Sequence, residues 1–203
     1  MEFIFLASAH FLALLSPGPD FFLIMQASLR LPLRFGLAIC CGIALANGVY
    51  LFLAIIGFEI IREMTLVLSA MKYLGAAYLL FLGFMLLRSP RQAIDSQRHQ
   101  SFISAESIVR QFFIGFISAI LNPKNMIFYL SLFTALVSVE TGFFTRCLYS
   151  LWMMSVVLVW DCLVVIAICR QRFKRWLGES IYYIEKLSGC ALACFGIMLP
   201  FTG

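Results

Sequence analysis

Long runs of apolar residues recur along the whole chain and constrain its fold more than any other feature of the sequence. They cover residues 3–29, 35–58, 64–87, 111–139, 147–169 and 187–201. All but the last exceed the roughly 20 residues that an α-helix needs to cross the hydrocarbon core of a bilayer. Only 12% of the residues are charged, about half the fraction found in soluble domains. The sequence therefore predicts an all-α integral membrane protein with six transmembrane helices, the sixth of them short.

One polar segment, residues 89–110, interrupts this pattern and separates two halves of three helices each. The halves are residues 1–88 and 111–203, and neither contains a stretch that predicts a soluble domain. We therefore expect a single membrane domain over residues 1–203. The first segment carries Glu2 where a signal peptide would have a basic region, so we expect it to be retained.

Basic residues are distributed unevenly among the connections. Eleven Lys and Arg follow the first, third and fifth segments, whereas three lie on the opposite side. The eleven are Arg30, Arg34, Arg88, Arg91, Arg98, Arg110, Arg170, Arg172, Lys174, Arg175 and Lys186, and the three are Arg62, Lys72 and Arg146. By the positive-inside rule, the linker 89–110 is cytoplasmic and both termini are periplasmic. Contact with anionic lipid of the bilayer then explains the net charge of +5, and we expect no nucleic-acid partner.

Proline interrupts two of the apolar segments. The interruptions read "SPGPD" at residues 16–20 and "LNPKN" at residues 121–125. Because proline removes a helical hydrogen bond and crowds the preceding turn, the first and fourth helices should be broken there. Three helices separate the two breaks, so the broken helices run in opposite directions. This predicts two inverted three-helix repeats, a plan that recurs among transporters.

The breaks should also expose backbone groups of both polarities. Pro123 denies a hydrogen bond to the carbonyl of Ala119, and Pro17 and Pro19 do the same to the carbonyls four residues before them. Such carbonyls can hold a cation or an ammonium group. The helices that restart at Gly18 and after Pro123 present free N–H groups at the positive end of the helix dipole, which suits a carboxylate.

Three charged residues, Asp20, Lys124 and Asp161, lie near the middle of their helices. Each is roughly 14 to 21 Å along the helix axis from the nearest basic residue that marks the membrane surface. An unpaired Asp or Lys at such a depth costs about 2.5 to 3.5 kcal/mol, so we expect the three to face one another, water or substrate. Asn47 is a further polar residue at mid-helix, roughly 17 Å from either end of its segment.

Carbonyls, N–H groups, one lysine and two aspartates match a zwitterion, and amino acids are the commonest small zwitterions. The residues that we expect to bind substrate or a coupling ion are Pro17, Gly18, Pro19, Asp20, Asn47, Asn122, Pro123, Lys124 and Asp161. Kinked helices without a substrate role remain an alternative. Asp161 could be neutral, or could pair with Lys124 only for structure. We interpret His10 as a packed histidine in preference to a proton relay.

Two other function classes stay open. Asp20 and Asp161 could form the dyad of an intramembrane aspartyl hydrolase, although Lys124 would disturb the sharing of a proton between them. The second class is an exporter of another small solute or ion, but a site for an inorganic ion should need more paired acids or sulfur ligands. The seven cysteines all fall in predicted helices without a Cys-x-x-Cys pair, so we expect no disulfide, metal or redox cofactor.

Small residues predict close packing between helices. Gly42 with Ala46, and Ala44 with Gly48, form overlapping small-xxx-small faces on one helix. The same faces would permit a homodimer.

Five stretches of the sequence carry a family resemblance. They are "SPGPD", "GIALANGVY", "KYLGAAYLLFLG", "FIGFISAILNPKNMIFYLSLF" and "KLSGCALACFGIML". Together they resemble the LysE/RhtB family of bacterial amino-acid exporters, and the resemblance covers the whole chain. It implies efflux of an amino acid or a derivative across the bacterial inner membrane, driven by an ion gradient, with protons as the expected ion. The family's motifs fall on residues 17–20 and 122–124, and Asn125 stands where the family pattern suggests a small residue.

Overall fold

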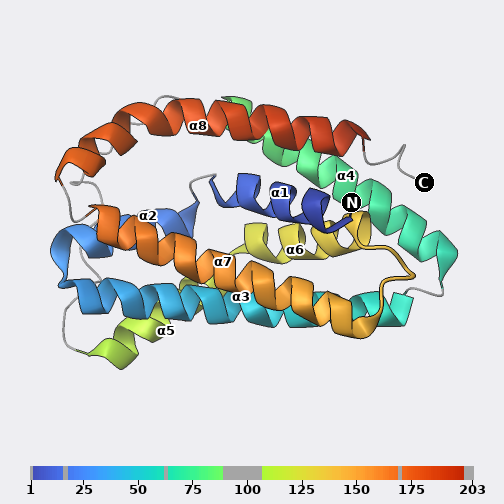
Figure 1. Cartoon of the computed structure of the whole chain (residues 1–203), viewed down its shortest axis with the longest axis horizontal. Helices are drawn as coiled ribbons and strands as arrows, with labels where there is room; N and C mark the ends of the chain where they lie inside the picture. Colours follow the sequence, from blue (N-terminus) through green and yellow to red (C-terminus); the bar gives the residue numbers. More distant parts are fainter. Residues whose placement is uncertain (1, 16–17, 62–63, 89–106, 169–170, 199–203) are drawn as a thin grey trace.

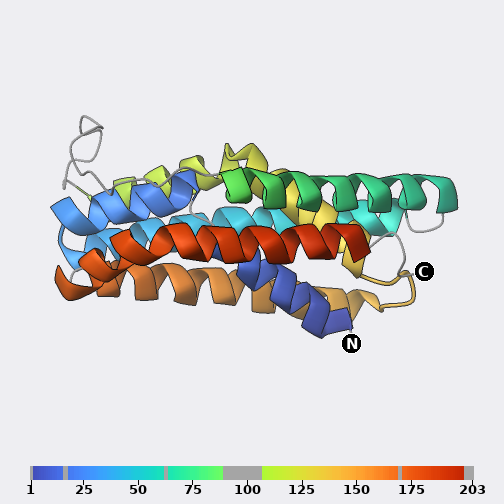
Figure 2. The same cartoon turned by 90° about the horizontal axis from the view of Figure 1, so that it is seen from above.

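The computed structural model describes residues 2–15, 18–61, 64–88, 107–168 and 171–198, and its regular structure there is entirely helical. The helices are α1 (Glu2–Leu14), α2 (Pro19–Arg30), α3 (Leu33–Ile61), α4 (Thr65–Arg88), α5 (Ile108–Ile120), α6 (Pro123–Leu136), α7 (Phe143–Ile168) and α8 (Gln171–Met198). They form one elongated bundle (Figure 1, Figure 2). Pro17 and most of the predicted linker, residues 89–106, lie outside the described residues.

Two of these helices are long and apolar enough to cross a membrane on their own. They are α3, over Leu33–Ile60, and α7, with mean hydropathies of 2.3 and 2.4 in their most apolar windows. The pairs α1–α2 and α5–α6 meet the same criterion if each is counted as one bent span. Shorter apolar stretches, Ala76–Met85 and Lys186–Met198, lie in α4 and α8. The chain is therefore a multi-pass membrane protein.

Both predicted helix breaks are confirmed. The first separates α1, which ends at Leu14, from α2, which begins at Pro19, and the two helices meet at a bend of 56°. The second separates α5, which ends at Ile120, from α6, which begins at Pro123, with a bend of 59°. Proline is tolerated at the first position of a helix because the N–H that it lacks would have no helical partner there.

The last helix differs from the prediction. We expected it over residues 187–201, but α8 begins at Gln171 and ends at Met198. Basic residues suggested a cytoplasmic connection before it. The stretch "QRFKRWLGESIYYIEK", however, has no proline, and its apolar residues recur every three or four positions, which favours an amphipathic helix. Lys186, which we had assigned to this connection, lies within α8 and donates a hydrogen bond to the carbonyl of Leu87 near the end of α4.

Helix α3 lies at the centre of the bundle and packs against α5 and α7, while α4 packs against α8 and α6. The contact between α3 and α5 depends on two glycines. A methyl group on Gly42 of α3 would lie 2.0 Å from the Phe112 carbonyl oxygen, and one on Gly115 of α5 would lie 2.2 Å from that of Ile39. The close packing predicted at Gly42 is thus confirmed, and it joins a helix of the first half to one of the second.

The start of α1 and the end of α8 lie at the same end of the bundle (Figure 1). The connection between α6 and α7 lies there too, and the Glu2 carboxylate of α1 holds it. This carboxylate accepts hydrogen bonds from the backbone N–H of Ser138, at 3.2 Å, and from the hydroxyl of Thr141, at 2.9 Å.

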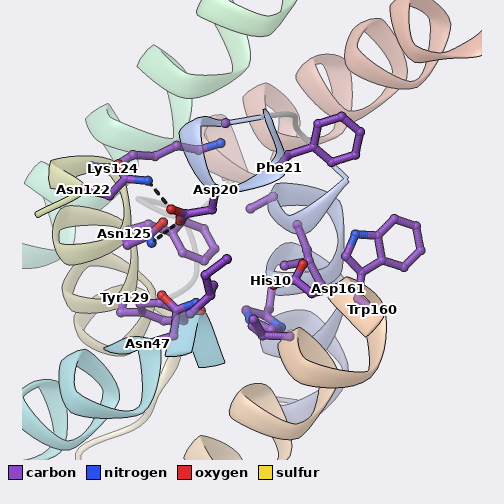
Figure 3. A pocket seen from close by; sticks show the side chains of 16 residues that line it. His10, Asp20, Phe21, Asn47, Asn122, Lys124, Asn125, Tyr129, Trp160 and Asp161 are labelled. Carbon is purple, nitrogen blue, oxygen red and sulfur yellow. Dashed lines mark hydrogen bonds between the residues drawn. The ribbon is translucent and has the colours of Figure 1, made fainter. Parts of the chain in front are cut away.

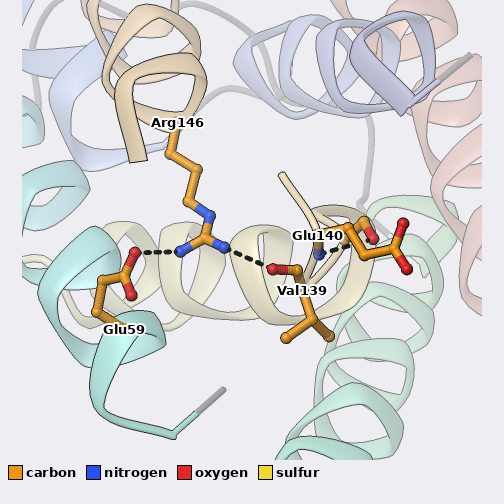
Figure 4. A network of polar contacts seen from close by, with 5 residues as sticks. Glu59, Val139, Glu140 and Arg146 are labelled. Atoms are coloured by element: carbon orange, nitrogen blue, oxygen red, sulfur yellow. Dashed lines mark hydrogen bonds and ion pairs between the residues drawn. The ribbon is translucent and has the colours of Figure 1, made fainter. Parts of the chain in front are cut away.

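Arg146, in the first turn of α7, is fully buried beside the same connection. Its guanidinium pairs with Glu59 of α3 at 2.8 Å and donates to the Val139 carbonyl at 3.1 Å (Figure 4). The ring of Phe58 lies 4.3 Å from the guanidinium carbon. We had placed Arg146 in a connection at the membrane surface. These partners explain its burial, because they replace the water that a buried guanidinium loses.

Candidate functional site

A cavity of about 70 Å³ lies inside the bundle where the two breaks come together (Figure 3). Residues of α1, α2, α3, α6 and α7 line it. The cavity is smaller than the roughly 300 to 1,000 Å³ of pockets for drug-sized ligands, and larger than the roughly 10 to 15 Å³ that one water molecule needs. It therefore suits a small solute.

Most of the residues that the sequence analysis singled out line this cavity. They are Gly18, Asp20, Asn47, Asn122, Lys124 and Asp161. Pro19 and Pro123 begin α2 and α6 and so define the two breaks; the Pro19 side chain is exposed. Residues that lie more than 140 positions apart in the sequence, such as Gly18 and Asp161, thus line one cavity.

Asp20 connects one break to the other. From the N-terminus of α2, its carboxylate accepts hydrogen bonds from Ser118 at 2.8 Å, Asn122 at 3.2 Å and Asn125 at 2.9 Å. All three donors belong to α5, α6 or the turn between them. A hydrogen bond to a charged group contributes about 1.5 to 3 kcal/mol, and the positive end of the α2 dipole adds about 0.3 to 1 kcal/mol. Both oxygens of Asp20 are therefore engaged within the protein.

Donors of the protein itself also satisfy the carbonyls at the second break. The Asn122 side chain caps α6 by accepting from the Lys124 N–H at 3.1 Å, and the Asn122 N–H donates to the Ala119 carbonyl at 3.2 Å. The hydroxyl of Tyr50, on α3, donates to the Ile120 carbonyl. Our prediction that the break leaves the Ala119 carbonyl free for a cation is wrong, because a tighter turn brings the N–H of the third residue after Ala119, in place of the fourth, within reach.

Lys124 extends from the first turn of α6 to the beginning of α2. A methyl group on Gly18 would lie 3.6 Å from Lys124 Nζ, so the ammonium group rests against the glycine. The hydroxyl of Tyr78, on α4, donates to the Lys124 carbonyl at 3.1 Å and fixes the backbone at this point. Gly18 is the N-cap of α2 and has no side chain with which to cap it. The ammonium group and the helix N-terminus together form a positive pole that favours a carboxylate.

Polar groups without partners also line the cavity. Within the described part of the chain, Asp161 of α7 forms no hydrogen bond or ion pair, although only 8% of it is exposed. Asn47 Oδ1 and both ring nitrogens of His10 likewise have no hydrogen-bond partner. Figure 3 shows His10 and Asp161 on the same side of the cavity, opposite Asn122 and Asn125. Because buried polar groups nearly always have partners, these atoms are available to a ligand or water.

Sequence reasoning missed several lining or supporting residues. Ser118 precedes Asn122 by one helical turn, so the helical spacing could have revealed it. Asn125 departs from the family pattern, and it is a donor to Asp20. His10 is packed as predicted, with its ring centre 5.9 Å from that of Tyr129, but it also lines the cavity. No signal in the sequence indicated that His10 lines the cavity.

Comparisons with known proteins agree with the resemblance noted in the sequence. The chain is 28% identical over 204 residues to a threonine efflux protein of Salmonella typhi, which covers 98% of this chain and 97% of that protein. It is 28% identical over 208 residues to a threonine efflux protein of Escherichia coli, with the same coverage. A leucine efflux protein of Klebsiella pneumoniae is 30% identical over 137 residues, 67% of this chain and 63% of that protein. No solved structure matches.

A family model decides the class of protein. The model described as LysE type translocator matches residues 11–203, which include all but one of the residues around the cavity. A translocator moves a solute and is not an enzyme, so the hydrolase alternative is excluded. The chain belongs to the LysE type translocator family.

Proposed function

We propose that this protein exports a small amino acid, or a derivative of one, from the cytoplasm in exchange for protons. The observation that carries the proposal is the arrangement of charge around the cavity. A positive pole at Lys124 and Gly18 faces the carboxylate of Asp161, which has no partner within the described residues. These are the charges that complement the two ends of a zwitterion. Relatives named threonine and leucine efflux proteins support an amino acid as the substrate.

The substrate carboxylate binds between Lys124 and the first N–H groups of α2. Its ammonium group binds to Asp161, with Asn47 Oδ1 as a second acceptor. The sequence leaves both Asp20 and Asp161 as candidates for this role. We now assign it to Asp161, because three donors already engage the oxygens of Asp20. Asp20 then acts as a positioning residue, which holds the α6 wall at a fixed distance from α2.

We further propose six spans in two inverted repeats, with both termini in the periplasm. Two features support this arrangement. The bends of 56° and 59° occur at equivalent places in the two halves, and the start of α1 and the end of α8 lie at the same end of the bundle (Figure 1). In this arrangement the halves move against each other around the cavity and open it to one side of the membrane at a time.

The test is a comparison of strains that overproduce the protein with strains that lack it. Growth is measured on a panel of amino acids and analogues at toxic concentrations, and mass spectrometry measures the intracellular pools. We expect resistance to one or a few amino acids, together with lower pools of the same compounds. Asp161→Asn should abolish both effects, whereas Glu140→Gln, the same chemical change at an exposed residue outside the cavity, should preserve them. Equal pools in all strains across the panel would overturn the proposal.

A further inference from the structure

We propose that His10 and Asp161 together bind the coupling proton, so that the proton and the amino group of the substrate occupy this wall of the cavity in turn. This inference rests on the proposed function and adds to it the location of the exchange. Neither residue has a hydrogen-bond partner in the described part of the chain, and both line the same cavity (Figure 3).

Aromatic rings hold the imidazole of His10 in place. The ring centres of Phe128, Tyr129 and Trp152 lie 6.3, 5.9 and 6.1 Å from that of His10. Only 1% of the histidine is exposed. A residue needed only for packing here would be apolar, because an imidazole brings two polar atoms that lose their water. The geometry therefore fixes the ring and leaves its nitrogens available.

The charges that face His10 leave one negative charge unbalanced. Asp20 comes from α2, Lys124 and Tyr129 come from α6, and Asp161 comes from α7. From α3 the lining residues are Ile43 and Asn47, neither of which titrates, and α8 supplies no lining residue among those that the structure describes. Cys40 of α3 and Cys162 of α7 are further titratable groups near Asp161, but neither lines the cavity. With Tyr129 neutral, the formal charges of Asp20 and Lys124 cancel, and that of Asp161 remains.

A zwitterion does not change this balance, but one proton does. When a proton binds to the His10–Asp161 pair, the net formal charge of the lining becomes zero and Asp161 no longer attracts an ammonium group. When the proton leaves, the carboxylate is again available to the substrate. An unpaired charge is costly in the membrane interior, and either ligand removes it at Asp161: the proton neutralises the carboxylate, and the substrate pairs its ammonium group with it. The cavity therefore favours changing sides with one of the two bound. This gives exchange of one proton for one substrate, and no other reactant is required.

Fluorescence can test proton binding without any substrate. The chain has three tryptophans, and Trp160→Phe with Trp176→Phe leaves Trp152, whose ring contacts His10, as the only one. Protonated imidazole quenches indole emission. We expect the emission of Trp152 in the purified protein to fall as the pH is lowered, and this change to disappear in His10→Gln and His10→Asn. In Asp161→Asn the midpoint should move by at least one pH unit.

Ser150→Ala is the matched control. Like Asp161, Ser150 is a buried α7 residue, and its hydroxyl has no hydrogen-bond partner among the residues that the structure describes. It does not line the cavity, so the titration of Ser150→Ala should equal that of the parent. Size-exclusion chromatography establishes that each variant is folded. An unchanged titration in both folded His10 variants would overturn the proposal.

Transport provides the second measurement. Proteoliposomes are loaded with radiolabelled threonine, and efflux driven by a proton gradient is compared with exchange of labelled for unlabelled threonine. We expect His10→Gln to lower the ratio of the rate of gradient-driven efflux to the rate of exchange at least tenfold. An unchanged ratio would contradict proton binding at His10. If overproduction of the parent protein lowers no amino-acid pool across the panel, the export proposal fails, whereas the fluorescence titration still decides whether His10 binds a proton.

Discussion

Asn125 of α6 donates a hydrogen bond of 2.9 Å to the carboxylate of Asp20 on α2, across 105 positions of the sequence. The family resemblance led us to expect a small side chain at this position. The departure therefore has a structural role: it adds a third donor to a carboxylate that Ser118 and Asn122 also engage. This contact ties the wall of the cavity on α6 to the beginning of α2.

Asn125→Ala should reduce export about tenfold, since it removes one hydrogen bond to a charged group, and about 1.4 kcal/mol corresponds to a factor of ten. Asn125→Asp should reduce export further, because it places a like charge against Asp20. Export is measured as the intracellular pool of the substrate in overproducing strains. Because the contact requires both partners, adding Asn125→Ala to Asp20→Asn should cost much less than tenfold. Full additivity of the two changes would show that the contact is irrelevant to transport.

Lys124→Ala should raise the KM for export at least tenfold, because the substrate carboxylate loses its ammonium partner at the start of α2. Lys124→Arg keeps the charge and should raise the KM less, although the planar guanidinium fits less well against Gly18. The measurement is the initial rate of threonine or leucine efflux from proteoliposomes against internal concentration. Equal effects of the two substitutions would mean that charge at this position is not what binds the substrate.

Gly42→Ala should destabilise the protein, because its new methyl group would lie 2.0 Å from the Phe112 carbonyl and force α3 and α5 apart. Overpacking of this kind costs about 1 to 3 kcal/mol, or a fall of roughly 2 to 12 °C in the melting temperature. The control is Gly57→Ala on the same helix. Among the described residues, no atom outside the surrounding turns of the helix backbone lies within 4 Å of the corresponding methyl group there, and alanine favours the helix by about 0.5 to 1 kcal/mol. A lower melting temperature for the Gly57 variant than for the Gly42 variant would contradict this account.

Glu59→Gln should also destabilise the protein, because it leaves the fully buried guanidinium of Arg146 without its carboxylate. Breaking a buried ion pair from one side costs about 3 to 5 kcal/mol. The double variant Glu59→Gln with Arg146→Met removes both charges and should be more stable than Glu59→Gln alone. Thermal unfolding in detergent, followed by loss of the monodisperse peak, measures the difference. A double variant that is less stable than either single one would show that the pair is not the reason for the effect.

The sequence predicted the helical fold and the positions of the two breaks because both depend on local chemistry. Apolar length indicates a membrane helix, and the prolines at 19 and 123 cannot continue one. The same reasoning failed at residues 171–186. Basic residues there suggested a connection, but the helical spacing of the apolar residues favours a helix, and α8 begins at Gln171. Burial of Arg146 was not predictable either, since its partner Glu59 lies 87 positions away.

For the site, the sequence identified charged residues at the correct depth but not their pairing. Depth follows from counting residues along a helix, whereas pairing depends on how helices rotate against one another. Asp20 and Asp161 illustrate the difference. Both were predicted to lie near the midplane, yet three side chains engage the first, and none of the described residues bonds to the second.

The hydrogen bonds of Asp20 also have a consequence for how the protein is made. Its donors lie 98, 102 and 105 residues later in the chain. At a synthesis rate of about 5 to 20 residues per second, Asp20 leaves the ribosome roughly 5 to 20 s before them. The first broken helix therefore leaves the ribosome with an acid whose three hydrogen-bond donors have not yet been made, and these contacts can form only after the start of the second broken helix has been synthesised.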